Sequence, residues 1–217
     1  MRFRTLPFLV LFAALCGCSE LPKRDPAKAG PFHTPANVSG VAKLPSDVRR
    51  VLVLPAADSG RTPSQSLDRL DEAILAELNR TARFETTSIS RDELRRVFGE
   101  RAYNSLSALP PRFLQILAER HGVDAVLFSD LTQFNAYPPL SVGLRFKLAR
   151  VSDQQILWAA DNVFSASDPA VVNSARRHAL SLGTDRSPGD LSHTILQHPT
   201  RFVGYAAAET FQTLPPR

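Results

Sequence analysis

The sequence predicts an α/β (α+β) domain in which helices flank a mixed sheet of about five strands. Two observations predict this class. Apolar residues recur at spacings of three and four, the helical period, in segments before residue 122 and after residue 168. Consecutive strand-like patterns lie between these segments. The expected order is β-α-β-α-α-β-β-β-α-α, with helices early and late and three successive strands between them.

The first elements have clear boundaries. The apolar run 51–54 ends at Pro55, which is typical of a buried strand. The run Thr62-Pro63-Ser64-Gln65 combines an N-cap, a proline at the first helical position and a capping-box glutamine. We therefore expect a helix to about Arg80, followed by a second strand over 84–89.

Two more helices precede the central strands. Residues 90–93 form another capping box, which predicts a helix that ends at Gly99. A further helix is expected to begin at Pro111 and to end at His121-Gly122, because glycine commonly terminates helices.

The central region is expected to be an antiparallel meander. An apolar strand covers 123–134, and residues 140–149 alternate between apolar and polar or small side chains. That period of two predicts a strand with one buried and one solvated face. A third strand is expected at 156–158. Helices follow after 168 and over 195–211, the latter interrupted near Pro199.

The N-terminus has the pattern of a signal peptide, because two arginines precede the apolar stretch 6–15. Its ten residues span roughly 15 Å, too short to cross a bilayer. The stretch ends in Leu15-Cys16-Gly17-Cys18, which resembles the lipobox of bacterial lipoprotein precursors. The resemblance implies a signal peptide over 1–17, cleavage between Gly17 and Cys18, and lipidation of Cys18. The alternative is an ordinary secretory signal with a coincidental cysteine.

Lipidation would attach diacylglycerol and an N-acyl chain, such as palmitate, to Cys18. Three acyl chains anchor a protein almost permanently. Ser19, which stands where an inner-membrane retention signal usually has aspartate, favours the periplasmic face of the outer membrane. We expect residues 18–47, rich in proline, to form a flexible tether, either a passive spacer or a binding motif. Residues 48–217 are expected to form a single globular periplasmic domain.

Composition and motifs exclude several function classes. The net charge of +5 falls to near +3 without the signal peptide and is not clustered, which argues against nucleic-acid binding. His193 and His198 are five residues apart, so they do not share a helical face, and we expect no metal and no other cofactor. The common catalytic motifs are also missing from the sequence, so we do not expect an enzyme.

One surface is a candidate for partner binding. Its residues lie on or beside the solvated side of the predicted meander and are Tyr137, Arg145, Lys147 and Arg150. The alternative is an ordinary solvated sheet face.

Four segments resemble periplasmic lipoprotein domains related to the curli-secretion channel subunit. They are 50–55, 83–88, 122–128 and 144–158. That group includes the outer-membrane lipoprotein that activates a penicillin-binding protein and the amino-terminal domain of the Tol-system β-propeller protein. The channel-forming members carry long hairpin insertions, each strand needing about nine to eleven residues to cross a membrane. The connection 135–139 is too short for this, so we do not expect a pore.

These observations leave two function hypotheses. The first is a non-catalytic interaction or assembly module that is held to the membrane by its lipid and binds another envelope protein. The second is a homo-oligomeric, ring-forming subunit of an envelope transport or secretion complex.

Overall fold

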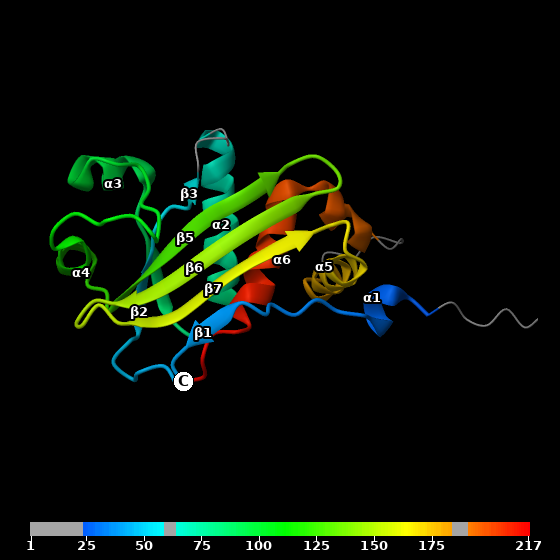
Figure 1. The fold of residues 1–217 in the computed structure, drawn as a ribbon, viewed down its shortest axis with the longest axis horizontal. Coiled ribbons are helices and arrows are strands. Elements are labelled where there is room, and N and C mark those ends of the chain that lie inside the picture. The colour runs from blue at the N-terminus through cyan, green and yellow to red at the C-terminus, as the bar shows by residue number, and fades with distance from the viewer. Residues whose placement is uncertain (1–23, 59–63, 184–190) are drawn as a thin grey trace, which may run out of the picture.

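One mixed sheet forms the centre of the molecule (Figure 1). The computed structural model describes residues 24–58, 64–183 and 191–217. The strands are β1 (Val38–Gly40), β2 (Arg50–Val53), β3 (Ala57–Asp58), β4 (Glu85–Ser88), β5 (Ala125–Asn135), β6 (Ser141–Arg150) and β7 (Ile156–Ser165). The helices are α1 (Pro26–Ala29), α2 (Ser64–Arg80), α3 (Arg91–Phe98), α4 (Phe113–His121), α5 (Pro169–Ser181), the 3-10 helix η1 (Ser192–Gln197) and α6 (Pro199–Phe211).

The sheet combines a parallel part with an antiparallel part. Its strand order is β1-β7-β6-β5-β2-β4, and β3 pairs with β5. Strand β2 runs parallel to both β4 and β5, because helix α2 returns the chain from β2 to β4. Strands β5, β6, β7 and β1 are antiparallel. The predicted class is confirmed, and the predicted elements follow one another as expected, but the described residues add α1, β1 and β3 and form a sheet of seven strands rather than about five.

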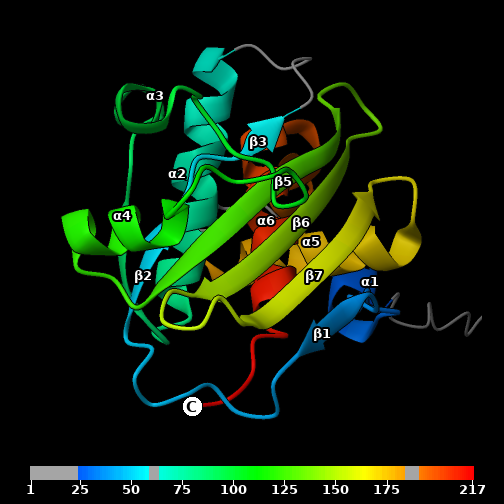
Figure 2. The same cartoon turned by 60° about the vertical axis from the view of Figure 1, so that its left-hand side comes forward.

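Helices cover the two faces of the sheet unequally (Figure 2). The larger core lies between one face and helices α2, α5 and α6, where the rings of Phe146 and Phe211 are 4.7 Å apart. The smaller core lies on the opposite face, where α3 and α4 pack against β2 and β5. Its rings include Phe98 and Phe113, 4.5 Å apart. Apart from α3 and α4, no helix in the described part of the chain lies over β6 and β7 on the second face (Figure 1).

Several predicted boundaries are confirmed. Ser90 caps α3 by accepting a hydrogen bond from the backbone N–H of Glu93 at 3.1 Å. Helix α4 ends at Gly122, whose φ of 64° lies in the left-handed region. The predicted interruption near Pro199 separates η1 from α6. The predicted N-cap at Thr62 lies outside the described residues.

The prediction of a flexible tether up to residue 47 is wrong for the described part of that segment. Strand β1 pairs with β7, and the side chains of Ala27 and Leu44 are buried. Composition misled the prediction because a few small apolar side chains and backbone hydrogen bonds suffice to attach a proline-rich segment to a sheet edge. The predicted signal peptide and Cys18 lie outside the described residues. In the part of the chain that the structure describes, no helix is long and apolar enough to cross a membrane.

Candidate functional site

The uncovered part of the second sheet face is the main candidate site. Strand register places Lys147 opposite Ala159 and Arg145 opposite Asp161 on this side of the sheet. Side chains that share this side and lie on β1, β6 and β7 define the open face: Ser39, Arg145, Lys147, Ala159, Asp161 and Val163. A shallow hollow of about 190 Å³ is lined by the first five of these residues together with Asn37 and Ala160.

Arg145 is the centre of an ionic network on the open face. Its Nε and Nη2 each lie 2.7 Å from Oδ2 of Asp161 on the neighbouring strand. Its Nη1 lies 3.8 Å from Oδ2 of Asp130 on the other neighbouring strand. Two carboxylates therefore hold one guanidinium, so its orientation is largely fixed before any partner binds.

The connection between α3 and α4 borders the open face. The hydroxyl and backbone N–H of Ser105 donate to Asp130 at 2.5 and 2.9 Å, and Lys147 Nζ donates to the Ser105 carbonyl at 3.0 Å. Tyr103 holds the same connection by packing against the ring of Phe113 at 4.8 Å. The sheet and this connection thus form one continuous surface.

Asp130 has an unusual environment for a carboxylate. It is only 1% exposed, and burial raises its pKa, because a charged group loses hydration there. Hydrogen bonds from Ser105 and the charges of Arg145 and Lys147 only partly offset this effect. Asp130 therefore has a positioning role within the network, since solvent and partners cannot reach it.

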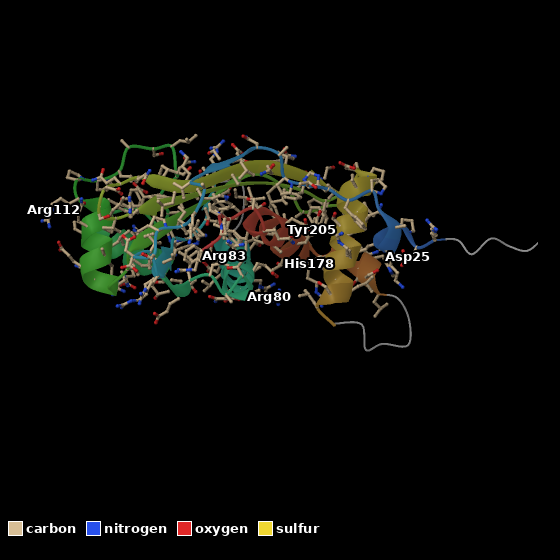
Figure 3. The ribbon with its side chains drawn as sticks, turned by 90° about the horizontal axis from the view of Figure 1, so that it is seen from below. Asp25, Arg80, Arg83, Arg112, His178 and Tyr205 are labelled. Atoms are coloured by element: carbon tan, nitrogen blue, oxygen red, sulfur yellow. The ribbon has the colours of Figure 1, made fainter. Side chains whose placement is uncertain are left out.

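A second polar cluster lies between helices α2, α5 and α6. His178 and Arg80, labelled in Figure 3, both contact the buried carboxylate of Glu77: Arg80 as an ion pair and His178 Nε2 at 3.7 Å. Burial alone would raise the pKa of Glu77, but the hydrogen bonds and charges of these two partners outweigh it and lower the pKa. The cluster borders a cavity of about 390 Å³ whose other walls include Ala73 and Gly204.

Known proteins resemble this chain in fold. No protein-family profile and no curated protein sequence matches it. A solved PelC dodecamer from Paraburkholderia phytofirmans is 15% identical, with 83% of this chain and 97% of that chain covered and a TM-score of 0.48. The LpoB C-terminal domain from Escherichia coli is 18% identical, with 58% and 87% covered and a TM-score of 0.37.

TolB from Acinetobacter baumannii is also similar. It is 18% identical, with 72% of this chain and 33% of that chain covered and a TM-score of 0.33. LpoB and TolB belong to the group that four segments of this sequence resemble, and that resemblance is confirmed as one of fold. At these identities the likeness concerns the fold alone.

The structure brings together only two of the four predicted partner-binding residues. Arg145 and Lys147 both lie on the open face. Strand alternation places Arg150 on the opposite side of β6, where it pairs with Asp153 and Asp47. Tyr137 is 79% exposed in the connection from β5 to β6, at the other end of these strands.

Three important residues were not predicted: Ser105, Asp130 and Asp161. An aspartate inside the apolar run of β5 was a visible signal, because a buried carboxylate requires partners. The partners themselves depend on strand register and on a distant connection. Among the described residues, no group of three or more histidine, cysteine or acidic side chains could hold a metal ion.

Proposed function

We propose that this chain is a lipid-anchored, non-catalytic interaction module of the bacterial envelope that binds another envelope protein through the open face. The lipid on Cys18 would hold it on the periplasmic face of the outer membrane. The observation that carries the proposal is the Arg145 network on a sheet face that no described helix covers.

The geometry of the open face supports recognition of a partner. Binding costs less conformational entropy when a side chain is already held in place, and arginine is enriched among residues that dominate interface energies. Arg145 is held by two carboxylates, yet its side chain is 23% exposed. Val163 adds an exposed apolar contact on the same face. We expect the partner to present acidic or carbonyl groups toward Arg145 and Lys147.

The same geometry gives little support to catalysis. Catalysis by a nucleophile requires a base that is within hydrogen-bond reach and is itself oriented by a third group. Ser105 and Asp130 contact each other, but Asp130 is buried and its other neighbours are cations. No histidine is among the described residues that line the hollow.

A ring-forming subunit is the second candidate function, and one observation favours it. Strands β1 and β4 stand at the two ends of the described sheet order, so neither has a strand neighbour on its outer side among the described residues. Head-to-tail contacts between different surfaces generate rings when the rotation closes. Light scattering of the detergent-solubilised protein distinguishes the two candidates: a single-chain mass at micromolar concentration excludes the ring.

A charge reversal tests the partner-binding proposal. The lipidated protein is purified from membranes as wild type, Lys147→Glu and Arg95→Glu, the last an exposed cation on α3 that serves as the control. Quantitative mass spectrometry should find an envelope protein whose recovery falls at least tenfold with Lys147→Glu but not with Arg95→Glu. Equal recovery of every co-purified protein in all three samples would exclude the open face as the binding surface.

The anchor requires its own test. Cells that express the wild type or Cys18→Ala are fed labelled palmitate. Label should enter only the wild type. If the Cys18→Ala variant took up labelled palmitate, or stayed in the membrane fraction, the lipid anchor on Cys18 would be excluded.

A further inference from the structure

Very little chain separates the proposed lipid from the folded domain. Arg24 is the first described residue, only six positions after Cys18. Six residues span at most about 20 Å when fully extended. If Cys18 is lipidated, Arg24 and the end of the molecule that holds it therefore stay within about 20 Å of the membrane surface.

The N-terminal segment is firmly attached at that end. Asp25 lies 3.3 Å from Arg176 of α5, and Asn173 of α5 donates to the carbonyl of Pro31 at 3.1 Å. The guanidinium of Arg177 stacks over Phe32 at 3.8 Å from the ring centroid. Figure 3 shows Asp25 at one end of the long axis and Arg112, beside α4, at the other.

Basic residues outnumber acidic residues at this end of the molecule. The described stretches 24–36, 169–183 and 191–203 build α1, α5, η1 and the start of α6, and these elements pack against one another. Asp25 is the acidic residue within these three stretches, Asp168 caps α5 directly before the second of them, and the buried Glu77 lines the cavity beside Arg201. Their arginines and lysine are Arg24, Lys28, Arg176, Arg177 and Arg201. We call this surface the basic end.

Two large apolar side chains are exposed beside these cations. Leu182 follows α5 and is 38% exposed, and Leu191 precedes η1 and is 46% exposed. Both border the cavity beside Arg201. Exposed leucines among cations are typical of surfaces that bind anionic membranes, where the apolar groups enter the headgroup region.

We infer that the basic end docks directly on an anionic lipid surface, with Leu182 and Leu191 entering the headgroup region. This inference rests on the lipid anchor of the proposed function and adds an orientation to it. The long axis stands away from the membrane, and α3 and α4 lie at the distal end (Figure 1). The open face then extends along the side of the molecule, where a partner can reach it.

A depth measurement tests this orientation in the intact lipoprotein. Cys16 leaves with the signal peptide and Cys18 is acylated, so an introduced cysteine is the single thiol. Leu191→Cys, Leu182→Cys and the distal control Arg95→Cys are labelled with a fluorophore. Each protein is then reconstituted in phosphatidylglycerol-containing vesicles whose acyl chains are brominated. Quenching is expected at 191 and 182 and should be absent at 95.

The possible outcomes distinguish failure of the docked orientation from failure of the lipid anchor. A protein that does not float with the vesicles refutes the anchor, and the docking inference fails with it. A protein that floats but shows the same weak quenching at all three positions keeps the anchor and refutes the docked orientation. Neither outcome affects partner binding by the open face.

Charge reversal provides an independent check. Each cation close to an anionic membrane contributes about fivefold to binding. The double variant Lys28→Glu with Arg201→Glu should therefore reduce the ratio of docked to undocked protein by at least about 25-fold. The matched control reverses Arg95 and Arg96, two exposed cations on α3. Equal loss of quenching at 191 in both double variants, or loss in neither, would contradict docking through the basic end.

Discussion

The hydroxyl of Ser105 donates a 2.5 Å hydrogen bond to the buried carboxylate of Asp130, twenty-five residues further along the chain. The backbone N–H of the same serine donates to the other carboxylate oxygen at 2.9 Å. These bonds attach the connection between α3 and α4 to the sheet. They also position the Asp130 carboxylate, which faces Arg145. The arrangement of the open face therefore depends on the largely buried contact between Ser105 and Asp130.

Replacement of Ser105 should weaken the attachment of the connection between α3 and α4 to the sheet. Ser105→Ala removes the hydroxyl donor and leaves one buried carboxylate oxygen without it, which should lower the free energy of unfolding by about 1–2 kcal/mol. Urea denaturation measures the change. Ser107→Ala, an exposed position in the same connection, is the control and should change stability by less than about 0.5 kcal/mol. If both substitutions changed the free energy of unfolding equally, the stabilising role of the hydrogen bond from Ser105 to Asp130 would be contradicted.

Asp71 should make stability depend on pH. Burial raises its pKa to about 6, against the opposing effect of Arg91, whose Nη2 lies 2.6 Å away. The folded state thus binds this proton more tightly than the unfolded state, whose aspartate pKa is about 3.9. The stability contributed by the proton is complete below pH 4 and is lost as pH rises through 6.

The matched variant is Asp71→Asn. Relative to this variant, the wild type should lose about 1–3 kcal/mol of stability between pH 4 and pH 7. Chemical denaturation over this range measures the difference. A wild type that gains stability relative to Asp71→Asn as pH rises would show that Arg91 outweighs burial and that the assigned direction is wrong.

A side chain at position 143 should destabilise the fold, because the neighbouring strand β5 has a bulge beside Gly143. The register between β5 and β6 shifts between Leu131 and Gln133, which brings the chain of β5 close to this glycine. An added Cβ would clash with Thr132 Oγ1 and would lie 3.1 Å from the backbone nitrogen of Gln133. The hydroxyl can rotate away, but the backbone cannot.

Gly143→Ala should therefore destabilise the protein by about 1–3 kcal/mol, the usual cost of overpacking. Thermal unfolding followed by circular dichroism measures it. The control is Val163→Ala, directly opposite on β7, whose side chain is half exposed. A neutral Gly143→Ala would mean that β5 relaxes freely at the bulge.

Leu44 tests whether the N-terminal segment is part of the folded domain. It is 3% exposed, and its backbone N–H donates to the carbonyl of Pro216 at 2.8 Å. Leu44→Ala should lower the free energy of unfolding by about 2–4 kcal/mol. Its neighbour Lys43 is exposed, so Lys43→Ala should have little effect. If neither Leu44→Ala nor Lys43→Ala changed the free energy of unfolding, the result would support the flexible tether predicted from composition.

The sequence predicted the elements whose identity depends on local chemistry. Alternation in 140–149 predicted the two faces of β6, and Ser90 and Gly122 marked helix ends through their capping behaviour. Strands β1 and β3 were not predicted, because two or three residues carry no measurable period. Their formation depends on neighbouring strands that supply backbone partners.

Of the candidate site, the sequence could predict only the residues that share one strand, β6. Alternation places Arg145 and Lys147 on one face, and the same rule assigns Arg150 to the other, which the prediction overlooked. Asp161 could not be matched to Arg145 without the register of β6 and β7. Ser105 lies in an irregular connection, whose path over the sheet has no sequence period.

The central claim is that the open face binds an envelope protein, and in-cell photo-crosslinking tests it most directly. A photoreactive amino acid replaces Ala159, opposite Lys147 in the middle of the open face, or Arg120, exposed at the end of α4. We predict one discrete crosslinked species from position 159, at a yield at least tenfold above that from position 120. Comparable yields from the two positions, or no crosslinked species from 159, would contradict the claim.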